Sequence, residues 1–293
     1  MDDQLRQQAI ELYDRFTHEG MERRDFFAAM TRLAGGAAAA NVLIGSIAAS
    51  PAAAAIVPAD ERRLRTGMTG LLGTNGQPLY NAYFAEPRTG KARRGTVIVV
   101  HENRGLNEHT RDVARRLGLA GFYALAPDFL SPSGGTPANE DAARDAIGKL
   151  DLGAATAAGV AMLDLLRGRK GGTGKVGVVG FCWGGAYVNR LAVAAGDKLA
   201  AGVVYYGTAP DAAEASRVSA PLLIQLAGLD MRVNNSAFPW VTALRAAGKS
   251  VTFQLYDGVN HAFNNDSSAE RYDKAAADLA WERTTAFLRK HLS

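Results

Sequence analysis

The sequence contains a single cysteine, Cys182, and no block of residues of one charge. One thiol cannot form an intramolecular disulfide or a cysteine-rich metal site. The chain has 33 Lys and Arg residues against 29 Asp and Glu residues, a net charge of only +4. Because no basic run alternates with aromatic residues, we expect no nucleic-acid partner. Its 293 residues, 47% of them hydrophobic, suffice for one sizeable domain and do not require two.

The first 60 residues differ in composition from the remainder. Residues 4–16 have apolar positions at helical spacing and predict a short amphipathic helix. The pair Arg23-Arg24 and the sequence Asp-Phe-Phe follow, then an apolar Ala/Gly-rich run over 33–49 that leads to Ala53-Ala54-Ala55. This order is typical of a secretory signal, and the paired arginines resemble a twin-arginine export signal. We therefore expect residues 1–60 to form a helical signal segment that engages the twin-arginine export machinery. Cleavage is expected after Ala55, with the mature protein periplasmic or extracellular.

Two other interpretations of this segment stay open. The run over 33–49 also fits an ordinary buried helix, in which case the protein would be cytoplasmic. A retained membrane anchor fits less well, because a run of about 17 residues interrupted by glycine is short for a bilayer that needs about 20.

Residues 61–293 predict one catalytic domain of the α/β class. Apolar β-type runs alternate with helical patterns, which indicates a mostly parallel sheet with helices on both faces. The first two strands flank Thr74-Asn75-Gly76, a hairpin signal. The predicted strands are 67–72, 79–84, 96–100, 122–126, 176–179, 201–205, 222–227 and 251–256, and the predicted helices are 107–120, 139–150, 151–168, 186–195, 236–247 and 269–291.

Cys182 lies in the sequence Gly180-Phe-Cys-Trp-Gly184, between a β-type run and an Ala-rich helical stretch. This strand–turn–helix context holds the nucleophile in α/β-hydrolases. The glycines are expected because the turn is strained and a Cβ on either one would clash with the neighbouring strand or helix.

An acid and a base follow in the order that such enzymes use. Asp230 and His261 each come just after a predicted strand, so all three side chains should meet at the carboxyl edge of the sheet. His261 would accept the thiol proton while Asp230 fixes its tautomer. The thiolate could then attack an ester or lactone carbonyl and form an acyl-cysteine.

Four short motifs make the chain resemble the dienelactone hydrolase (carboxymethylenebutenolidase) family of α/β-hydrolases over residues 67–292. They are His101-Glu102-x-x-Gly105, Gly180-x-Cys182-x-Gly184-Gly185, Gly228-x-Asp230 and His261-Ala-Phe263. The resemblance implies an α/β-hydrolase fold, a Cys182–His261–Asp230 triad, and a small-molecule ester or lactone substrate. It further implies that Glu102 accepts a hydrogen bond from the resting thiol and that the backbone N–H groups of Asn103 and Trp183 form the oxyanion hole. No cofactor or metal is implied, and we expect a monomer or a small homo-oligomer.

The chain departs from the family in its arginines. Members of the family hold a substrate carboxylate with an arginine that comes just after one of the strands. The corresponding stretch here, residues 126–132, contains no arginine. A second family arginine follows the histidine closely, but here Asn264-Asn265-Asp266 occupies that place and Arg271 lies further along. Dienelactone itself is therefore not predicted as the substrate, while hydrolysis of some ester or lactone is.

Simpler roles exist for the same residues. Asp230 could merely cap a helix, His261 could be a core histidine, and Glu102 could only form an ion pair with Arg104 or Arg111. The alternative function is a non-catalytic binding protein on an α/β-hydrolase fold. A redox role for the thiol is disfavoured because no second cysteine could resolve a disulfide.

Overall fold

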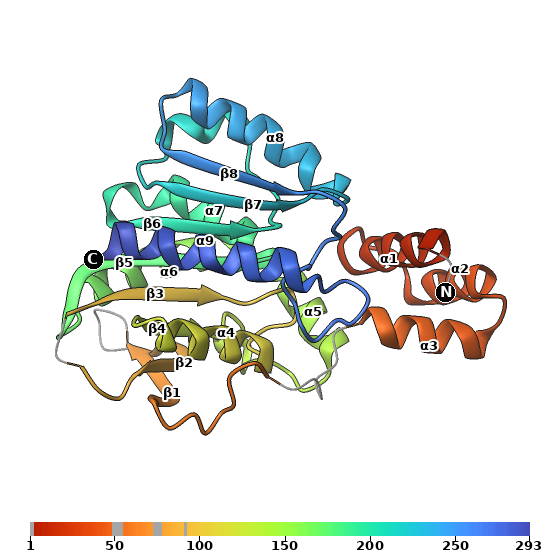
Figure 1. Cartoon of the computed structure of the whole chain (residues 1–293), viewed down its shortest axis with the longest axis horizontal. Coiled ribbons are helices and arrows are strands. Elements are labelled where there is room, and N and C mark those ends of the chain that lie inside the picture. Colours follow the sequence, from red (N-terminus) through yellow and green to blue (C-terminus); the bar gives the residue numbers. More distant parts are fainter. Residues whose placement is uncertain (1–2, 49–54, 73–77, 91–92) are drawn as a thin grey trace.

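The computed structural model describes residues 3–48, 55–72, 78–90 and 93–293. Its centre is an eight-stranded sheet with the order β1-β2-β4-β3-β5-β6-β7-β8 (Figure 1). The strands are β1 Leu64–Leu72, β2 Pro78–Pro87, β3 Arg94–Val100, β4 Tyr123–Pro127, β5 Gly172–Phe181, β6 Ala201–Tyr205, β7 Leu222–Ala227 and β8 Val251–Tyr256.

The sheet is antiparallel only at one side. β1 pairs antiparallel with β2, and β2 with β4, whereas the neighbours from β4 to β8 are all parallel. The predicted mostly parallel α/β fold is thus confirmed. Because the parallel strands end at one edge, the segments that follow β3, β5, β7 and β8 meet there. The predicted hairpin turn at 74–76 lies outside the described residues.

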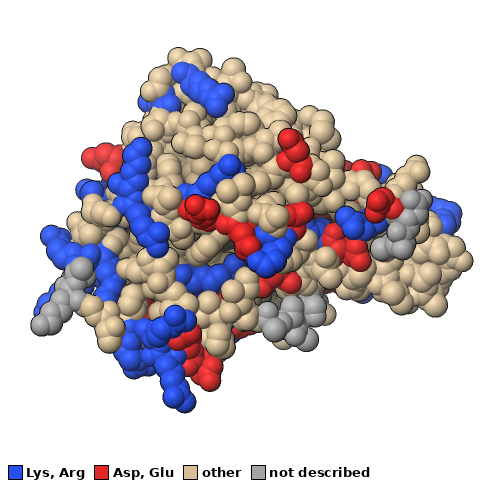
Figure 2. All heavy atoms as spheres, viewed as in Figure 1, with Lys and Arg blue, Asp and Glu red and all other residues tan. Residues whose placement is uncertain are grey.

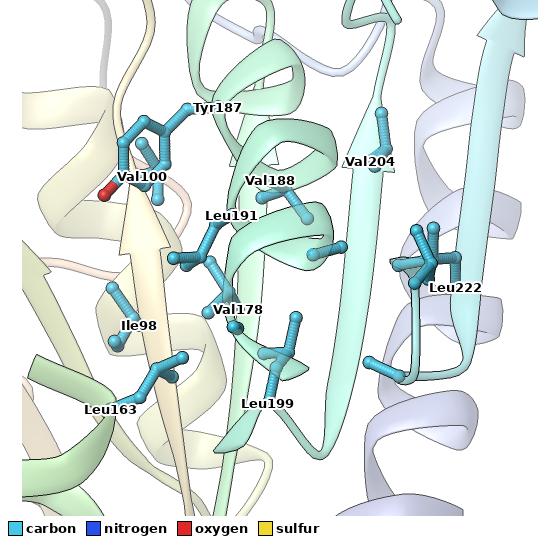
Figure 3. Packing of buried hydrophobic residues seen from close by; sticks show 14 of the residues in the cluster. Ile98, Val100, Leu163, Val178, Tyr187, Val188, Leu191, Leu199, Val204 and Leu222 are labelled. Atoms are coloured by element: carbon cyan, nitrogen blue, oxygen red, sulfur yellow. The ribbon is translucent and has the colours of Figure 1, made fainter. Parts of the chain in front are cut away.

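Helices cover both faces of the sheet. On β3, Ile98 and Val100 face one hydrophobic cluster, whereas Val97 and Val99 face the other, because successive strand residues point to opposite sides. Figure 3 shows the first cluster, to which the helices contribute Leu163 and Leu191 among others. The helices of the domain are α4 Glu108–Leu119, α5 Glu140–Gly148, α6 Leu152–Arg167, α7 Trp183–Ala194, α8 Met231–Ala246 and α9 Lys274–Leu292.

Several helices begin where a side chain caps them rather than where apolar spacing begins. Helix α8 starts at Met231 instead of 236, because the side chain of Asp230 accepts a hydrogen bond from the backbone N–H of Val233. Helix α9 starts at Lys274 instead of 269, where Asp273 plays the same part. Helix α7 starts directly after Cys182.

The amino-terminal segment forms three helices with a hydrophobic core of their own. They are α1 Asp3–His18, α2 Arg23–Ala34 and α3 Ala37–Ile47, and we call residues 3–48 the N-terminal helical unit. Ile10, Met30 and Leu43, one from each helix, are buried together. Figure 1 shows the unit beyond the sheet edge toward which the parallel strands point.

The expected amphipathic helix over 4–16 is present as α1. The apolar run over 33–49 is interrupted where Gly35, with φ of 76°, ends α2. Among the described residues, no single helix is long and apolar enough to cross a membrane, and α2 with α3 meets the criterion only as a pair bent by 107°. The proposed cleavage sequence Ala53-Ala54-Ala55 lies almost wholly outside the described residues.

Charged side chains of both signs are interspersed over the surface. In the view of Figure 2, acidic side chains lie among the basic ones instead of leaving a continuous basic face. The small net charge of +4 is therefore matched on this face by basic and acidic side chains that lie among one another.

Candidate functional site

Cys182 occupies a strained turn between β5 and α7. Its φ of 53° and ψ of −113° are costly for a residue with a side chain. A Cβ on Gly180 would lie 2.1 Å from the carbonyl oxygen of Gly184, and one on Gly184 would lie 2.4 Å from that of Val100. The two glycines therefore allow strand and helix to approach closely enough to hold the turn, as the sequence predicts.

The strain is concentrated around this turn. Among the described residues, the other non-glycine residues with positive φ are Tyr206, after β6, and Ala262, next to His261. Tyr206 lines a cavity together with Cys182. Unfavourable backbone conformations persist where the surrounding structure enforces them, most often at functional sites.

The structure brings Asp230 and His261 into direct contact. An oxygen of the Asp230 carboxylate lies 2.5 Å from Nδ1 of His261, and both side chains are buried. The other carboxylate oxygen accepts the N–H of Val233 at 3.1 Å. Asp230 thus caps α8 and orients the imidazole at the same time, so the simpler capping role is true but incomplete.

Cys182 lies beside the same imidazole. The sulfur of Cys182, a ring nitrogen of His261 and a ring nitrogen of His18 are all within 4.8 Å of one another. Nε2 of His261 is buried and has no hydrogen-bond partner among the described residues. Burial opposes the imidazolium, but the Asp230 carboxylate and an ionised Cys182 outweigh it and raise the pKa of His261 to about 10. The histidine can therefore hold a proton taken from the thiol.

Glu102 reaches the site through different partners from those expected. Its carboxylate accepts hydrogen bonds from the hydroxyl of Tyr206 at 3.3 Å and from the side chain of Asn265 at 2.8 Å. Neither Arg104 nor Arg111 forms an ion pair with it in the described part of the chain. A hydrogen bond from the thiol to Glu102 is not formed in this structure, so its role toward the thiol stays a prediction.

The backbone N–H groups predicted for the oxyanion hole stay available. Trp183 is the first residue of α7, where helix geometry leaves the N–H without an intrahelical acceptor. Asn103 follows β3 in the next loop toward the same edge, and neither backbone N–H donates a hydrogen bond to another described residue. Their part in binding an oxyanion is a prediction that this geometry permits.

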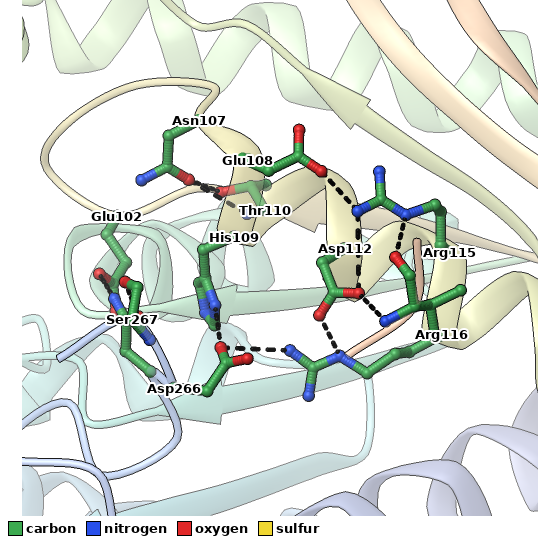
Figure 4. A network of polar contacts seen from close by, with 12 residues as sticks. Glu102, Asn107, Glu108, His109, Thr110, Asp112, Arg115, Arg116, Asp266 and Ser267 are labelled. Atoms are coloured by element: carbon green, nitrogen blue, oxygen red, sulfur yellow. Dashed lines mark hydrogen bonds and ion pairs between the residues drawn. The ribbon is translucent and has the colours of Figure 1, made fainter. Parts of the chain in front are cut away.

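A polar network holds the loop that follows His261. Asp266 contacts Nδ1 of His109 at 2.9 Å and the guanidinium of Arg116, which also pairs with Asp112 at 2.9 Å (Figure 4). Asn265, next to Asp266, donates to Glu102. The loop that carries His261 is thereby anchored on α4 and on the loop after β3, which restricts the position of the imidazole.

Sequence reasoning missed His18, the last residue of α1. Its Nε2 lies 3.9 Å from the sulfur of Cys182, and its ring meets that of His261 edge to face, with centroids 5.0 Å apart. The two contacting residues His18 and Cys182 are 164 positions apart. An isolated histidine at the end of an amphipathic helix carries no local signal for such a contact.

The arginines near the nucleophile are also distributed differently from the family pattern. Arg271 lies 3.4 Å from the Asp14 carboxylate of α1, and Arg104 donates to the hydroxyl of Tyr13 at 2.6 Å. Arg232, on α8, lines a cavity with Cys182, and its Nε is buried without a hydrogen-bond partner among the described residues.

A cavity of about 750 Å³ opens at Cys182. The α/β domain supplies Cys182, Trp183 and Arg232 to its lining, and residues between Phe16 and Arg23 supply another part of the wall. A cavity of this size accommodates a small-molecule substrate. His18, Cys182 and His261 are residue types that also bind metals, but the Asp230 contact and the proton on His261 fit acid–base chemistry with a thiol.

Comparison with known proteins places the chain in one family. The model of the dienelactone hydrolase family matches residues 80–292. A protein of Escherichia coli O157:H7 named "Putative carboxymethylenebutenolidase" is 30% identical over 259 residues, which span 83% of this chain and 94% of that protein.

Solved structures extend the comparison. The crystal structure described as a "Putative Dienelactone Hydrolase" from Klebsiella pneumoniae is 28% identical, with a TM-score of 0.68 over 78% of this chain and 99% of that one. A bacterial brefeldin A esterase, 13% identical, has a TM-score of 0.64 and covers 91% of this chain and 86% of its own, which shows the shared α/β-hydrolase fold alone. On the match over residues 80–292, the chain belongs to the dienelactone hydrolase family.

Proposed function

We propose that this member of a hydrolase family cleaves a carboxylic ester or lactone through an acyl-cysteine at Cys182. The observation that carries the proposal is the buried contact of 2.5 Å between Asp230 and His261, together with the sulfur of Cys182 within 4.8 Å of the same imidazole. Nucleophile, base and orienting acid are then in the relation that covalent acyl transfer requires.

The proposed reaction has two steps. The thiolate of Cys182 attacks the carbonyl carbon, the C–S bond forms, and the C–O bond breaks as His261 gives its proton to the leaving oxygen. Water then loses a proton to His261 and attacks the thioester, and the C–S bond breaks with its electron pair returning to sulfur. In both steps the N–H groups of Asn103 and Trp183 would meet the oxyanion, where one such donor contributes about 10²–10³ in rate.

The decisive experiment compares the wild type and Cys182→Ala on a panel of aryl esters and lactones. We expect turnover by the wild type, its loss in the variant, and a mass increase on the Cys182 peptide when the reaction is quenched early. Because Cys182 is the only cysteine, the adduct is unambiguous. Equal turnover by the variant would refute the thiol mechanism. If no substrate is turned over and none forms an adduct, the alternative of a non-catalytic binding protein is favoured. The contact of Asp230 with His261 beside Cys182 argues against that alternative.

A further inference from the structure

The N-terminal helical unit is attached to the catalytic domain around the nucleophile. The side chain of Ser268 donates to the carbonyl oxygen of Ile47 at 2.6 Å, and the backbone N–H of Glu270 donates to that of Ser46 at 3.2 Å. These contacts fix α3 on the loop that follows His261. The contacts of Tyr13 and Asp14 with Arg104 and Arg271 fix α1 on the loops after β3 and β8.

The end of α1 is oriented by Asn103. Its side-chain nitrogen donates to the carbonyl oxygen of Thr17 at 3.4 Å and faces Nδ1 of His18 at 3.5 Å. Since an amide nitrogen can only donate, this contact requires Nδ1 of His18 to accept, and a neutral ring then carries its proton on Nε2. Nε2 is the atom that lies 3.9 Å from the sulfur of Cys182. The imidazole therefore presents an N–H to the nucleophile.

His18 and His261 differ in charge although they face the same sulfur. Burial, the positive charge of His261 and that of Arg232 lower the pKa of His18 well below its usual value of 6.5. His18 is thus neutral at pH 7 and acts as a hydrogen-bond donor, whereas His261 carries the transferable proton.

The contact does not close the site. The cavity of about 750 Å³ includes both His18 and Cys182, with Gly20 and Met21 of the connection between α1 and α2 in its wall. The helical unit and Cys182 therefore share the wall of one open cavity.

We propose that His18 is a catalytic residue of the thiol site, donating its Nε2–H to the sulfur of Cys182, and that the N-terminal helical unit completes the active site. This inference rests on the proposed function. The N–H stabilises the thiolate before it attacks, and again when the C–S bond of the thioester breaks and the electron pair returns to sulfur. No proton is transferred from His18 in either step.

Other charged or titratable groups around the sulfur come from every neighbouring element. They are Glu102 and Arg104 after β3, Tyr206 after β6, Asp230 and Arg232 at the start of α8, His261 and Arg271 after β8, and Tyr13 and Asp14 on α1. Variants of His18 leave all of these in place, so a change in thiol reactivity can be assigned to the Nε2–H.

The test uses the full-length chain with His18→Phe, which keeps a ring without a donor, and His18→Gln, whose side-chain nitrogen can replace Nε2–H. Arg15→Gln on the same helix is the control, since Arg15 is exposed and, in the described part of the chain, its side chain pairs with Glu19 alone. Iodoacetamide alkylation of Cys182 is measured against pH, and kcat/KM is measured with an aryl ester, after circular dichroism has verified folding.

We expect His18→Phe to move the midpoint of the alkylation profile about one pH unit higher and to lower kcat/KM at pH 7 about tenfold, with His18→Gln restoring most of both. Unchanged alkylation in His18→Phe would overturn the proposal, and so would a gain in activity, which would make the helical unit a plug instead. Alkylation needs no turnover. It therefore still decides the role of His18 if Cys182→Ala shows that the proposed hydrolysis is wrong.

Discussion

Replacing Asp230 by asparagine separates the two contacts of that side chain. Asparagine caps helices as well as aspartate does, so the bond to the N–H of Val233 and the fold should survive. The contact of 2.5 Å with His261 changes, because a neutral amide can no longer stabilise an imidazolium and can also donate to Nδ1. Asn at this position therefore removes the base function of His261 without removing the cap of α8.

The size of the effect follows from burial. Both partners are almost fully enclosed, and a hydrogen bond to a charged group is worth about 1.5–3 kcal/mol, or about 10–150-fold in rate. The wrong tautomer adds to this loss, which reaches about 10⁴-fold where a hydroxyl nucleophile depends on its base. A thiol depends less on its base, so we expect kcat/KM to fall at least about 100-fold for Asp230→Asn.

The pH profile gives an independent measure. The carboxylate of Asp230 contributes to raising the pKa of His261 to about 10, so the alkaline limb of the wild-type kcat/KM profile should lie near that pH. In Asp230→Asn it should move toward the ordinary value of 6.5. Asp273→Asn, which changes the cap of α9, is the matched control and should leave both kcat/KM and the limb unchanged. A loss of less than threefold in Asp230→Asn with an unmoved alkaline limb would refute the assignment of Asp230 as the orienting acid.

Three further predictions concern stability and export. Gly184→Ala should reduce the free energy of unfolding in urea by about 3 kcal/mol, since its Cβ would lie 2.4 Å from a backbone oxygen. Gly45→Ala, in open space on α3, is the control and should leave the free energy of unfolding unchanged or raise it. Equal effects of the two substitutions would contradict the close approach at Gly184. The raised pKa of His261 stabilises the fold fully below pH 6.5 and progressively less as pH rises through about 10. The urea midpoints of the wild type and of His261→Gln should therefore converge over that pH range. A difference that stays constant with pH would contradict a contribution of His261 protonation to stability. We also propose export through the twin-arginine route with residues 3–48 retained, since cleavage after Ala55 would remove the His18 on which the preceding proposal depends: replacing Arg23 and Arg24 by lysine should retain the protein in the cytoplasmic fraction on immunoblots, and an unchanged distribution would exclude this signal.

The sheet and the contact between Asp230 and His261 could be predicted because their signals are local. Residues 97–100 are all apolar and β-branched, a short run that is typical of a strand buried on both faces, and β3 is such a strand. Asp230 and His261 each follow a strand, and the edge at which parallel strands end brings such positions together without any further information.

The role of the N-terminal segment could not be predicted in the same way. An apolar helix after a charged stretch and before small residues fits an export signal and also fits a helix of a small packed unit, so composition does not separate them. The residues that attach the unit, Tyr13, Asp14 and His18, are single polar positions whose partners lie in distant loops. Nothing in their spacing indicates a contact that depends on the whole tertiary structure.

The contacts that attach α1 also change the charges near Cys182, in a family member that lacks the expected arginines. Arg271 stands in the loop after His261, but α1 places the carboxylate of Asp14 3.4 Å from its guanidinium. Arg104 is likewise engaged by Glu140 and by the hydroxyl of Tyr13. While the helical unit is in place, two cations that could meet an anionic substrate are already compensated. If the proposed hydrolysis holds, the substrate charge that this site accepts would be set jointly by the α/β domain and by the helices that precede it.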